Sequence, residues 1–307
     1  MGPGIVPVVS EDGVGWKHLE ESAVTWDGEK KELTVRLRPT GESVWIAHVV
    51  PYVWTDLKKT LAEVGRSAWA RVEVIGRSAR GRELQMVTVT DWGVPDEGKK
   101  VIWLQARQHA WEAGTSYVME GALRLVTSDD PKAAELRKRC VFRFTPMVDV
   151  DGCALGRVRF NANGWDVNRH WAAVDLRDKA WLERTPEIWY AKRAIVSAGR
   201  IDLMVNLHNT ETGEYLATHV EEGGEVRRMM ERFYDRLVER TTFDPSKKLA
   251  TGQGVDDTNS LWTTHRVPVM LMEQRIATGK KLGRAPTVED RLKFGRDLIA
   301  AMAEAVR

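Results

Sequence analysis

The stretch that decides the fold is Val101-Ile102-Trp103-Leu104-Gln105-Ala106, which continues directly into Arg107-Gln108-His109-Ala110-Trp111-Glu112. Its apolar first half is typical of a buried strand. A histidine and a carboxylate follow at a spacing of three, and residues three apart in a tight turn project to the same side. Zinc binds such a pair and still needs another protein ligand. The spacing also occurs by chance in many chains, so the pair requires support from elsewhere in the sequence.

A second apolar run, Ile201-Asp202-Leu203-Met204-Val205-Asn206-Leu207, also ends in a histidine, His208. His208 offers the further protein ligand that zinc needs, and like His109 it stands at the end of an expected strand. The two motifs are far apart in the sequence, so they meet only if their strands are neighbours in one sheet. The alternative is a histidine that ends a strand and hydrogen-bonds to a loop.

Glu273 ends a third apolar run, Val267-Pro268-Val269-Met270-Leu271-Met272. An unpaired carboxylate is costly to desolvate there. A general base that faces a metal-activated water avoids this cost, because the cation stabilises the ionised carboxylate. A salt bridge to Arg266 or Arg275 is the structural alternative.

A fourth cluster, residues 157–171, combines Gly and Asn with several Arg residues. Such loops usually bind their own backbone and nearby surface acids. Beside a metal, an Arg can stabilise an oxyanion, and a second Arg with an Asn amide can bind a carboxylate. Asp166 can orient a ligand histidine by accepting its second N–H.

Composition narrows the class of protein. The chain has 307 residues, 43% hydrophobic and 29% charged, which is an ordinary globular balance. The formal charge of +2 gives no reason to expect nucleic acid or a membrane as a partner. No apolar run is long enough to span a bilayer, and the start lacks the features of a signal peptide, so we expect a cytoplasmic protein. The two cysteines, Cys140 and Cys153, are expected to be reduced thiols, and the absence of a Cys/His cluster excludes a zinc finger.

The order of expected elements predicts an α/β fold with a mixed, largely parallel twisted sheet flanked by helices. Residues 1–52 are expected to form a small β-rich appendage, and residues 53–307 a catalytic domain. Three strands are expected in the appendage, at residues 23–26, 33–37 and 44–50. Further strands are expected at residues 70–74, 84–90, 101–106, 140–147, 201–207 and 267–273. Helices are expected at residues 55–62, 116–126, 132–138, 179–197, 225–239 and 287–306.

Taken together, these motifs resemble the zinc metallocarboxypeptidase family, the carboxypeptidase A-like enzymes, and most of all its cytosolic carboxypeptidase branch. The family's His-x-x-Glu is present as His109 to Glu112, and the residues that follow resemble the continuation in that branch. The Arg-x-x-x-x-Gly-x-Asp-Leu-Asn-Arg-x-Trp block is matched by Arg159 to Trp171, with Val167 in place of Leu. Residues 51–57 resemble the join between the N-terminal β-domain and the catalytic domain of that branch.

The resemblance covers residues 44–307 and implies a role for each matched residue. One zinc ion would bind His109, Glu112 and His208, with Glu273 as general base. Arg159 would polarise the substrate carbonyl and stabilise the oxyanion, and Asn168 with Arg169 would bind the terminal carboxylate. The N-terminal β-domain of the family is normally larger. Residues 250–265 contain no tyrosine where the family usually has one, and Trp262 or His265 could take its place.

The implied function is a zinc-dependent metallocarboxypeptidase that removes C-terminal residues from peptides or proteins. An amidohydrolase of the aspartoacylase and succinylglutamate desuccinylase type is an alternative, although those enzymes carry the zinc motif closer to the N-terminus. A peptidoglycan-trimming enzyme and a non-catalytic peptide-binding module on the same fold are further alternatives. The sequence does not indicate an oligomeric state or the preferred C-terminal residue.

Overall fold

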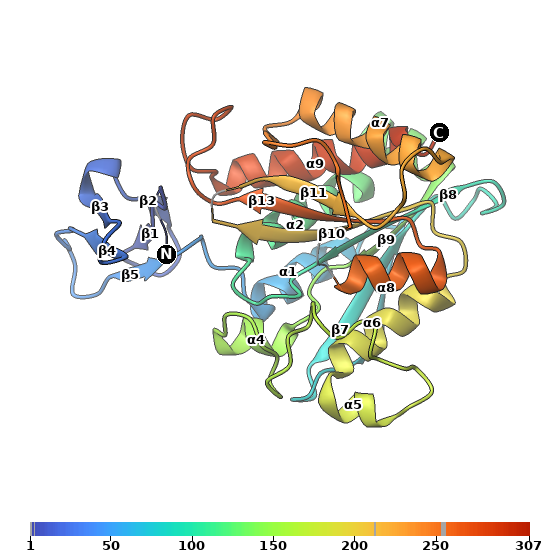
Figure 1. Cartoon of the computed structure of the whole chain (residues 1–307), viewed down its shortest axis with the longest axis horizontal. Coiled ribbons are helices and arrows are strands. Elements are labelled where there is room, and N and C mark those ends of the chain that lie inside the picture. Colours follow the sequence, from blue (N-terminus) through green and yellow to red (C-terminus); the bar gives the residue numbers. More distant parts are fainter. Residues whose placement is uncertain (1, 3, 212, 253–255) are drawn as a thin grey trace.

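The computed structural model describes residue 2 and residues 4–211, 213–252 and 256–307. In these residues an eight-stranded sheet lies at the centre of the larger part of the molecule, with the strand order β12-β11-β13-β10-β8-β9-β7-β6 (Figure 1). Its strands are β6 (Ala70–Arg77), β7 (Glu83–Val89), β8 (Lys100–Ala106), β9 (Cys140–Thr145), β10 (Leu203–Thr210), β11 (Tyr215–Thr218), β12 (Ala250–Thr251) and β13 (Val269–Arg275).

The four central strands β13, β10, β8 and β9 run parallel to one another. Strands β7 and β6 continue the sheet on one side in antiparallel pairs, and β11 pairs antiparallel with β13 on the other. The predicted mixed α/β fold, with a largely parallel centre, is therefore confirmed.

Helices cover both faces of this sheet (Figure 1). On one face lie α2 (Ala113–Thr127), α7 (Glu225–Arg240) and α9 (Val288–Ala305), and on the other lie α6 (Pro186–Ser197) and α8 (Asp256–His265). The remaining helices are α1 (Trp54–Val64), α3 (Pro131–Arg139), α4 (Val150–Leu155) and α5 (Ala180–Arg184).

Side-chain alternation along β10 divides the apolar core between the two faces. Leu203, Val205 and Leu207 belong to the core cluster that includes helices α2 and α9, whereas Met204 belongs to the cluster that includes α6. Because successive side chains of a strand point to opposite faces, His208 lies on the same face as Met204. The face on which His208, a candidate ligand, projects is thus set by the apolar residues that precede it.

The N-terminal part contains more strands than the three expected. Strands β1 (Val8–Ser10), β2 (Lys17–His18) and β5 (Trp45–Ala47) form one small sheet, and β3 (Val24–Asp27) and β4 (Glu32–Val35) form another. We call residues 4–52 the N-terminal module. It lies beside the larger part of the molecule, and Ile5 and Val49 pack with Ile276 and Ala277 there (Figure 1). The domain boundary at residues 52/53 stays a prediction.

Several short elements differ from the sequence-based expectation. Helices α4 and α8 and strands β11 and β12 lie where the sequence analysis expected no helix or strand. Residues 253–255, just before α8, lie outside the described part. Short elements carry little periodic signal, so patterns in the sequence locate them poorly.

Cys140 and Cys153 are both buried and free, as expected. Among the described helices, none combines the length and the apolar character that crossing a bilayer requires.

Helices α2 and α9 approach each other unusually closely, through one glycine on each. A methyl group at Gly121 would overlap the backbone of Leu292, and one at Gly295 would overlap the backbone of Val118. Since α2 begins directly after Glu112, this contact also fixes the position of that carboxylate.

We expect Gly295→Ala to lower the free energy of unfolding by about 3 kcal/mol, because the added methyl group forces two packed backbones apart. Urea unfolding followed by circular dichroism would measure the change. Gly28→Ala is the control, since its methyl group would meet its nearest atom at an ordinary 3.7 Å. An unchanged unfolding midpoint for Gly295→Ala would contradict the close approach.

Candidate metal centre and catalytic pocket

The parallel pairing of β10 and β13 brings His208 and Glu273 side by side. The register pairs Met204 with Val269 at one end of the ladder and His208 with Glu273 near the other. On the opposite side of β13, Tyr215 of β11 is paired with Glu273. Paired residues of neighbouring strands project from the same face of a sheet. Tyr215, Glu273 and His208 therefore form a row across three strands.

His109 and Glu112 lie in the turn that joins β8 to α2. The turn begins at Arg107, which has a positive φ of 60°. The buried Arg107 guanidinium donates hydrogen bonds to the carbonyl oxygens of Tyr52 and Ala110 and to the Ser116 hydroxyl, and so holds the turn in place. Glu112 is the N-cap of α2, where the positive end of the helix dipole favours its charge.

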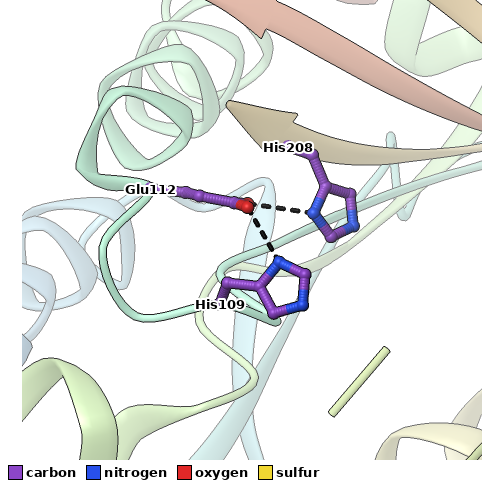
Figure 2. A group of neighbouring side chains, drawn as sticks. All are labelled: His109, Glu112 and His208. Carbon is purple, nitrogen blue, oxygen red and sulfur yellow. Dashed lines mark hydrogen bonds and ion pairs between the residues drawn. The ribbon is translucent and has the colours of Figure 1, made fainter. Parts of the chain in front are cut away.

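The three predicted ligands converge in space (Figure 2). His109 Nδ1 lies 2.8 Å from Glu112 Oε1, and His208 Nδ1 lies 2.9 Å from Glu112 Oε2. The potential ligand atoms of the three residues all lie within 4.8 Å of one another. Apart from their contact with each other, Glu112 Oε2 and His208 Nδ1 are buried without a polar partner among the described residues. Two imidazole nitrogens and one carboxylate form the donor set of a zinc site that keeps an open position, so these residues fit a zinc ion.

Asp166 connects this cluster to Arg159. Its Oδ1 lies 3.2 Å from His109 Nε2, the ring nitrogen that faces away from Glu112. Its Oδ2 accepts a 2.6 Å hydrogen bond from Arg159 Nε. One carboxylate thus orients both an imidazole of the candidate metal centre and the guanidinium beside it.

Burial disfavours the charged forms of His109, Glu112 and His208, but the attraction between the carboxylate and the imidazoles outweighs this effect. Burial acts to raise the pKa of Glu112, yet the His208 and His109 imidazoles lower it to about 2. Burial acts to lower the pKa of His208, yet the Glu112 carboxylate raises it to about 9. The pKa of His109 is raised too, because hydrogen bonds with Asp166 and Glu112 outweigh burial. A cation that binds here displaces protons from the imidazoles.

Glu273 has no ion-pair partner among the described residues. Its Oε2 is buried without a hydrogen bond. Burial raises the pKa of Glu273 to about 7, in opposition to the His208 imidazole, which lowers it. The alternative salt bridge is not formed within the described part: Arg275 donates to the Thr278 carbonyl, and Arg266 lies over the Trp262 ring.

Asn168 and Arg169 lie next to this centre. Asn168 is buried, with its Nδ2 3.3 Å from His208 Nε2, and Arg169 donates to the Asn168 carbonyl. Both line a pocket of about 430 Å³, which we call the catalytic pocket. Its other lining residues are His109, Trp111, Glu112, Arg159, Asn209, Thr210, Glu211, Tyr215, Leu271 and Glu273. His208 lies behind this lining, fully buried.

Tyr215 is a pocket residue that sequence reasoning missed. Burial and the Glu273 charge raise the pKa of its phenol to about 12, so at neutral pH it is a neutral donor. Neither Trp262 nor His265 lines the catalytic pocket. Tyr215 escaped notice because its strand is only four residues long, and no pattern in the sequence predicts its pairing with β13.

Asp257 is a second such residue, on α8. It is fully buried and accepts hydrogen bonds from the side chains of Gln108 and Asn206, which lie one and two residues before the candidate ligands His109 and His208. A buried acid at the start of a helix is not evident from sequence, because both of its partners are distant along the chain.

Comparison with known proteins identifies the family. A family model described as zinc carboxypeptidase matches residues 59–213, just over half of the chain. The chain belongs to the zinc carboxypeptidase family. An uncharacterized protein of Zymomonas mobilis, ZMO1242, is 30% identical over 204 residues, which cover 66% of this chain and 49% of that protein. Mouse cytosolic carboxypeptidase 2 is 34% identical over 161 residues, which cover 50% of this chain and 18% of that protein.

The fold of the family is seen in solved structures as well. A metallo-carboxypeptidase from Burkholderia cenocepacia superposes with a TM-score of 0.84 at 24% identity, over 99% of this chain and 81% of that one. Carboxypeptidase A from Helicoverpa armigera superposes with a TM-score of 0.62 at 15% identity, over 83% of this chain and 74% of that one. The chain spans half or less of the length of the two sequence relatives named above.

We expect Asp166→Asn to weaken zinc binding by roughly 10- to 100-fold, the usual effect of losing a carboxylate behind a ligand histidine. Competition with a fluorescent chelator would measure the affinity. Asp175→Asn, at an exposed carboxylate paired with Arg177, is the control and should bind zinc normally. Equal affinities for the two variants would contradict the orienting role of Asp166.

Proposed function

We propose that the chain is a zinc-dependent metallocarboxypeptidase that hydrolyses the C-terminal peptide bond of peptides or proteins. The observation that carries the proposal is the register of β10 and β13, because it pairs the candidate ligand His208 with an unpartnered buried carboxylate, Glu273. In the proposal His109, Glu112 and His208 hold one zinc ion, as the zinc carboxypeptidase family implies. The domain boundary and the cytoplasmic location remain predictions.

His109, Glu112 and His208 would hold the zinc ion, which would act as a Lewis acid and make water in the site more acidic. In the proposed mechanism Glu273 takes a proton from the attacking water and delivers it to the leaving amine. A pKa raised by burial and lowered by nearby positive charge suits a group that both accepts and releases a proton near neutral pH.

Arg159 is proposed to donate hydrogen bonds to the substrate carbonyl oxygen as negative charge develops on it. Its Nε is already bonded to Asp166, so the guanidinium is oriented before the substrate arrives and little reorganisation is needed. The rate benefit therefore comes from preorganisation.

Asn168 and Arg169 are proposed to bind the free carboxylate of the substrate. A planar guanidinium and an amide recognise a carboxylate by charge-assisted hydrogen bonds. The amide group that can donate to a carboxylate is Asn168 Nδ2, and the backbone N–H of Asn168 donates to Asp166 Oδ1 and so holds the residue in place. The requirement for a free carboxylate is what makes the proposed activity that of an exopeptidase.

Tyr215 and Leu271 line the catalytic pocket beside Glu273. The phenol lies close enough to the charges of Glu273 and Arg169 for both to affect its pKa. We therefore place the C-terminal residue of the substrate against these two side chains, between the general base and the carboxylate clamp.

Glu273→Gln tests the general base. We expect kcat to fall by roughly 10²- to 10⁴-fold while the zinc content stays at one ion per chain, because proton transfer is lost and the ligands are not. Release of free amino acid from a peptide panel and elemental analysis would measure the two quantities. Glu63→Gln, at an exposed carboxylate on α1, is the control. Undiminished turnover by the Glu273→Gln protein would contradict this assignment.

Arg169→Ala tests the carboxylate clamp. We expect kcat/KM to fall by roughly 10- to 100-fold for peptides with a free C-terminus, because a hydrogen bond to a charged group is lost. Peptides amidated at the C-terminus should resist the wild-type protein as well. The exposed Arg177→Ala serves as the control. Efficient cleavage of amidated peptides would contradict the carboxylate clamp. It would instead favour an amidohydrolase that does not require a free terminal carboxylate.

A further inference from the structure

A small hollow lies where the N-terminal module meets helices α2 and α9, and we call it the junction hollow. Its lining includes His18 and His48 of the module, Tyr117 of α2 and Arg291 of α9. It has room for about one group the size of a water molecule. A charged side chain therefore faces a small space at the boundary between two parts of the molecule.

Arg291 differs from the other buried arginines of the described part. Arg107, Arg137 and Arg227 are buried too, and each donates hydrogen bonds to at least two acceptors. Arg291 is only 5% exposed, yet among the described residues none accepts a hydrogen bond from its guanidinium or forms an ion pair with it. An unpaired charge is costly to bury, so the surroundings of Arg291 lack a compensating group.

The carboxylates whose charge acts on Arg291 are bound to other groups. Asp290 pairs with Arg284, and Glu214 accepts hydrogen bonds from two backbone N–H groups. Burial lowers the pKa of Arg291 to about 10, and attraction from these two carboxylates opposes burial only in part. The guanidinium is therefore still charged at neutral pH, without a direct partner.

The charge of Arg291 lies beside the junction hollow. The pKa of His18 is lowered by burial first and by the charge of Arg291 second. Burial raises the pKa of the Tyr117 phenol, and the same charge opposes this rise. On another side the guanidinium is packed against α2, because a methyl group at Gly114 would lie 2.6 Å from Arg291 Cζ.

These properties fit a small monovalent anion. The guanidinium carries five N–H donors, and a neutral imidazole at His18 can donate one more. Because burial lowers the pKa of both His18 and His48, the positive charge at the hollow is that of Arg291 alone, which one monovalent anion balances. Phosphate, sulfate and carboxylate groups are too large for a space of about one water molecule.

We propose that the junction hollow binds one chloride ion on the Arg291 guanidinium. The ion compensates the buried charge and joins the N-terminal module to α2 and α9. Since Gly114 follows the candidate ligand Glu112 by two residues, the ion also supports the first turn of α2. The inference does not depend on the proposed function.

Thermal unfolding of the zinc-loaded protein in sodium chloride and in sodium gluconate, at equal ionic strength, tests the proposal. Both salts screen surface charges alike, but gluconate is too large for the junction hollow. An ion that binds only the folded protein raises its Tm. The change in Tm from gluconate to chloride should be about 2–4 °C more positive for the wild-type protein than for Arg291→Met, which keeps an unbranched side chain and removes the charge.

Arg296→Met is the matched control, because Arg296 is an exposed arginine on the same helix. It should respond to chloride as the wild-type protein does. General effects of either salt on stability are common to all three proteins and cancel in the comparison. An equal response of all three proteins overturns the inference.

Bromide locates the ion directly in the wild-type protein. Crystals grown in sodium bromide should give an anomalous scattering peak in contact with the Arg291 guanidinium. A water molecule at this position, without an anomalous signal, overturns the inference, and it does so even if Arg291→Met fails to fold. Neither measurement uses turnover, so a failure of the proposed function leaves both results interpretable.

Discussion

The register of the central parallel strands is the constraint on which the site depends. Strands β8, β10 and β13 are paired so that their carboxyl ends meet at one edge of the sheet. His109 follows the first, His208 lies near the end of the second and Glu273 near the end of the third. A slip of one residue in any pairing would turn the corresponding side chain to the opposite face of the sheet. The apolar residues that precede each polar one specify this register, so the core and the site are encoded by the same strands.

Around that edge, polar and charged side chains compensate one another through direct contacts. Glu112 lies between two imidazoles, and Asp166 lies between an imidazole and the Arg159 guanidinium. Each carboxylate makes two directional contacts, which fixes the orientation of both partners. Each carboxylate has one partner nearby in the sequence and one that is distant, so the tertiary fold completes both geometries.

Much of this arrangement could be predicted from the sequence, for identifiable reasons. His109 and Glu112 are three residues apart, and His208 and Glu273 each end an apolar run, so periodicity alone indicated them. Their convergence could not be read from periodicity, because strand order is a long-range property, and the family resemblance supplied it. Tyr215 and Asp257 were missed for the same reason: each acts through partners on other elements. The turn at Arg107 depends on a positive φ that a non-glycine residue seldom adopts.

The glycine contact between α2 and α9 has a consequence for the order in which the molecule is made. Helix α2, which starts at the candidate ligand Glu112, is wedged against α9, a helix that the ribosome completes long after it. Strand β13 also emerges late. A nascent chain therefore lacks both the support for that carboxylate and the strand that carries Glu273. The candidate metal centre and its proposed general base are therefore assembled only after α9 has been translated and has packed against α2.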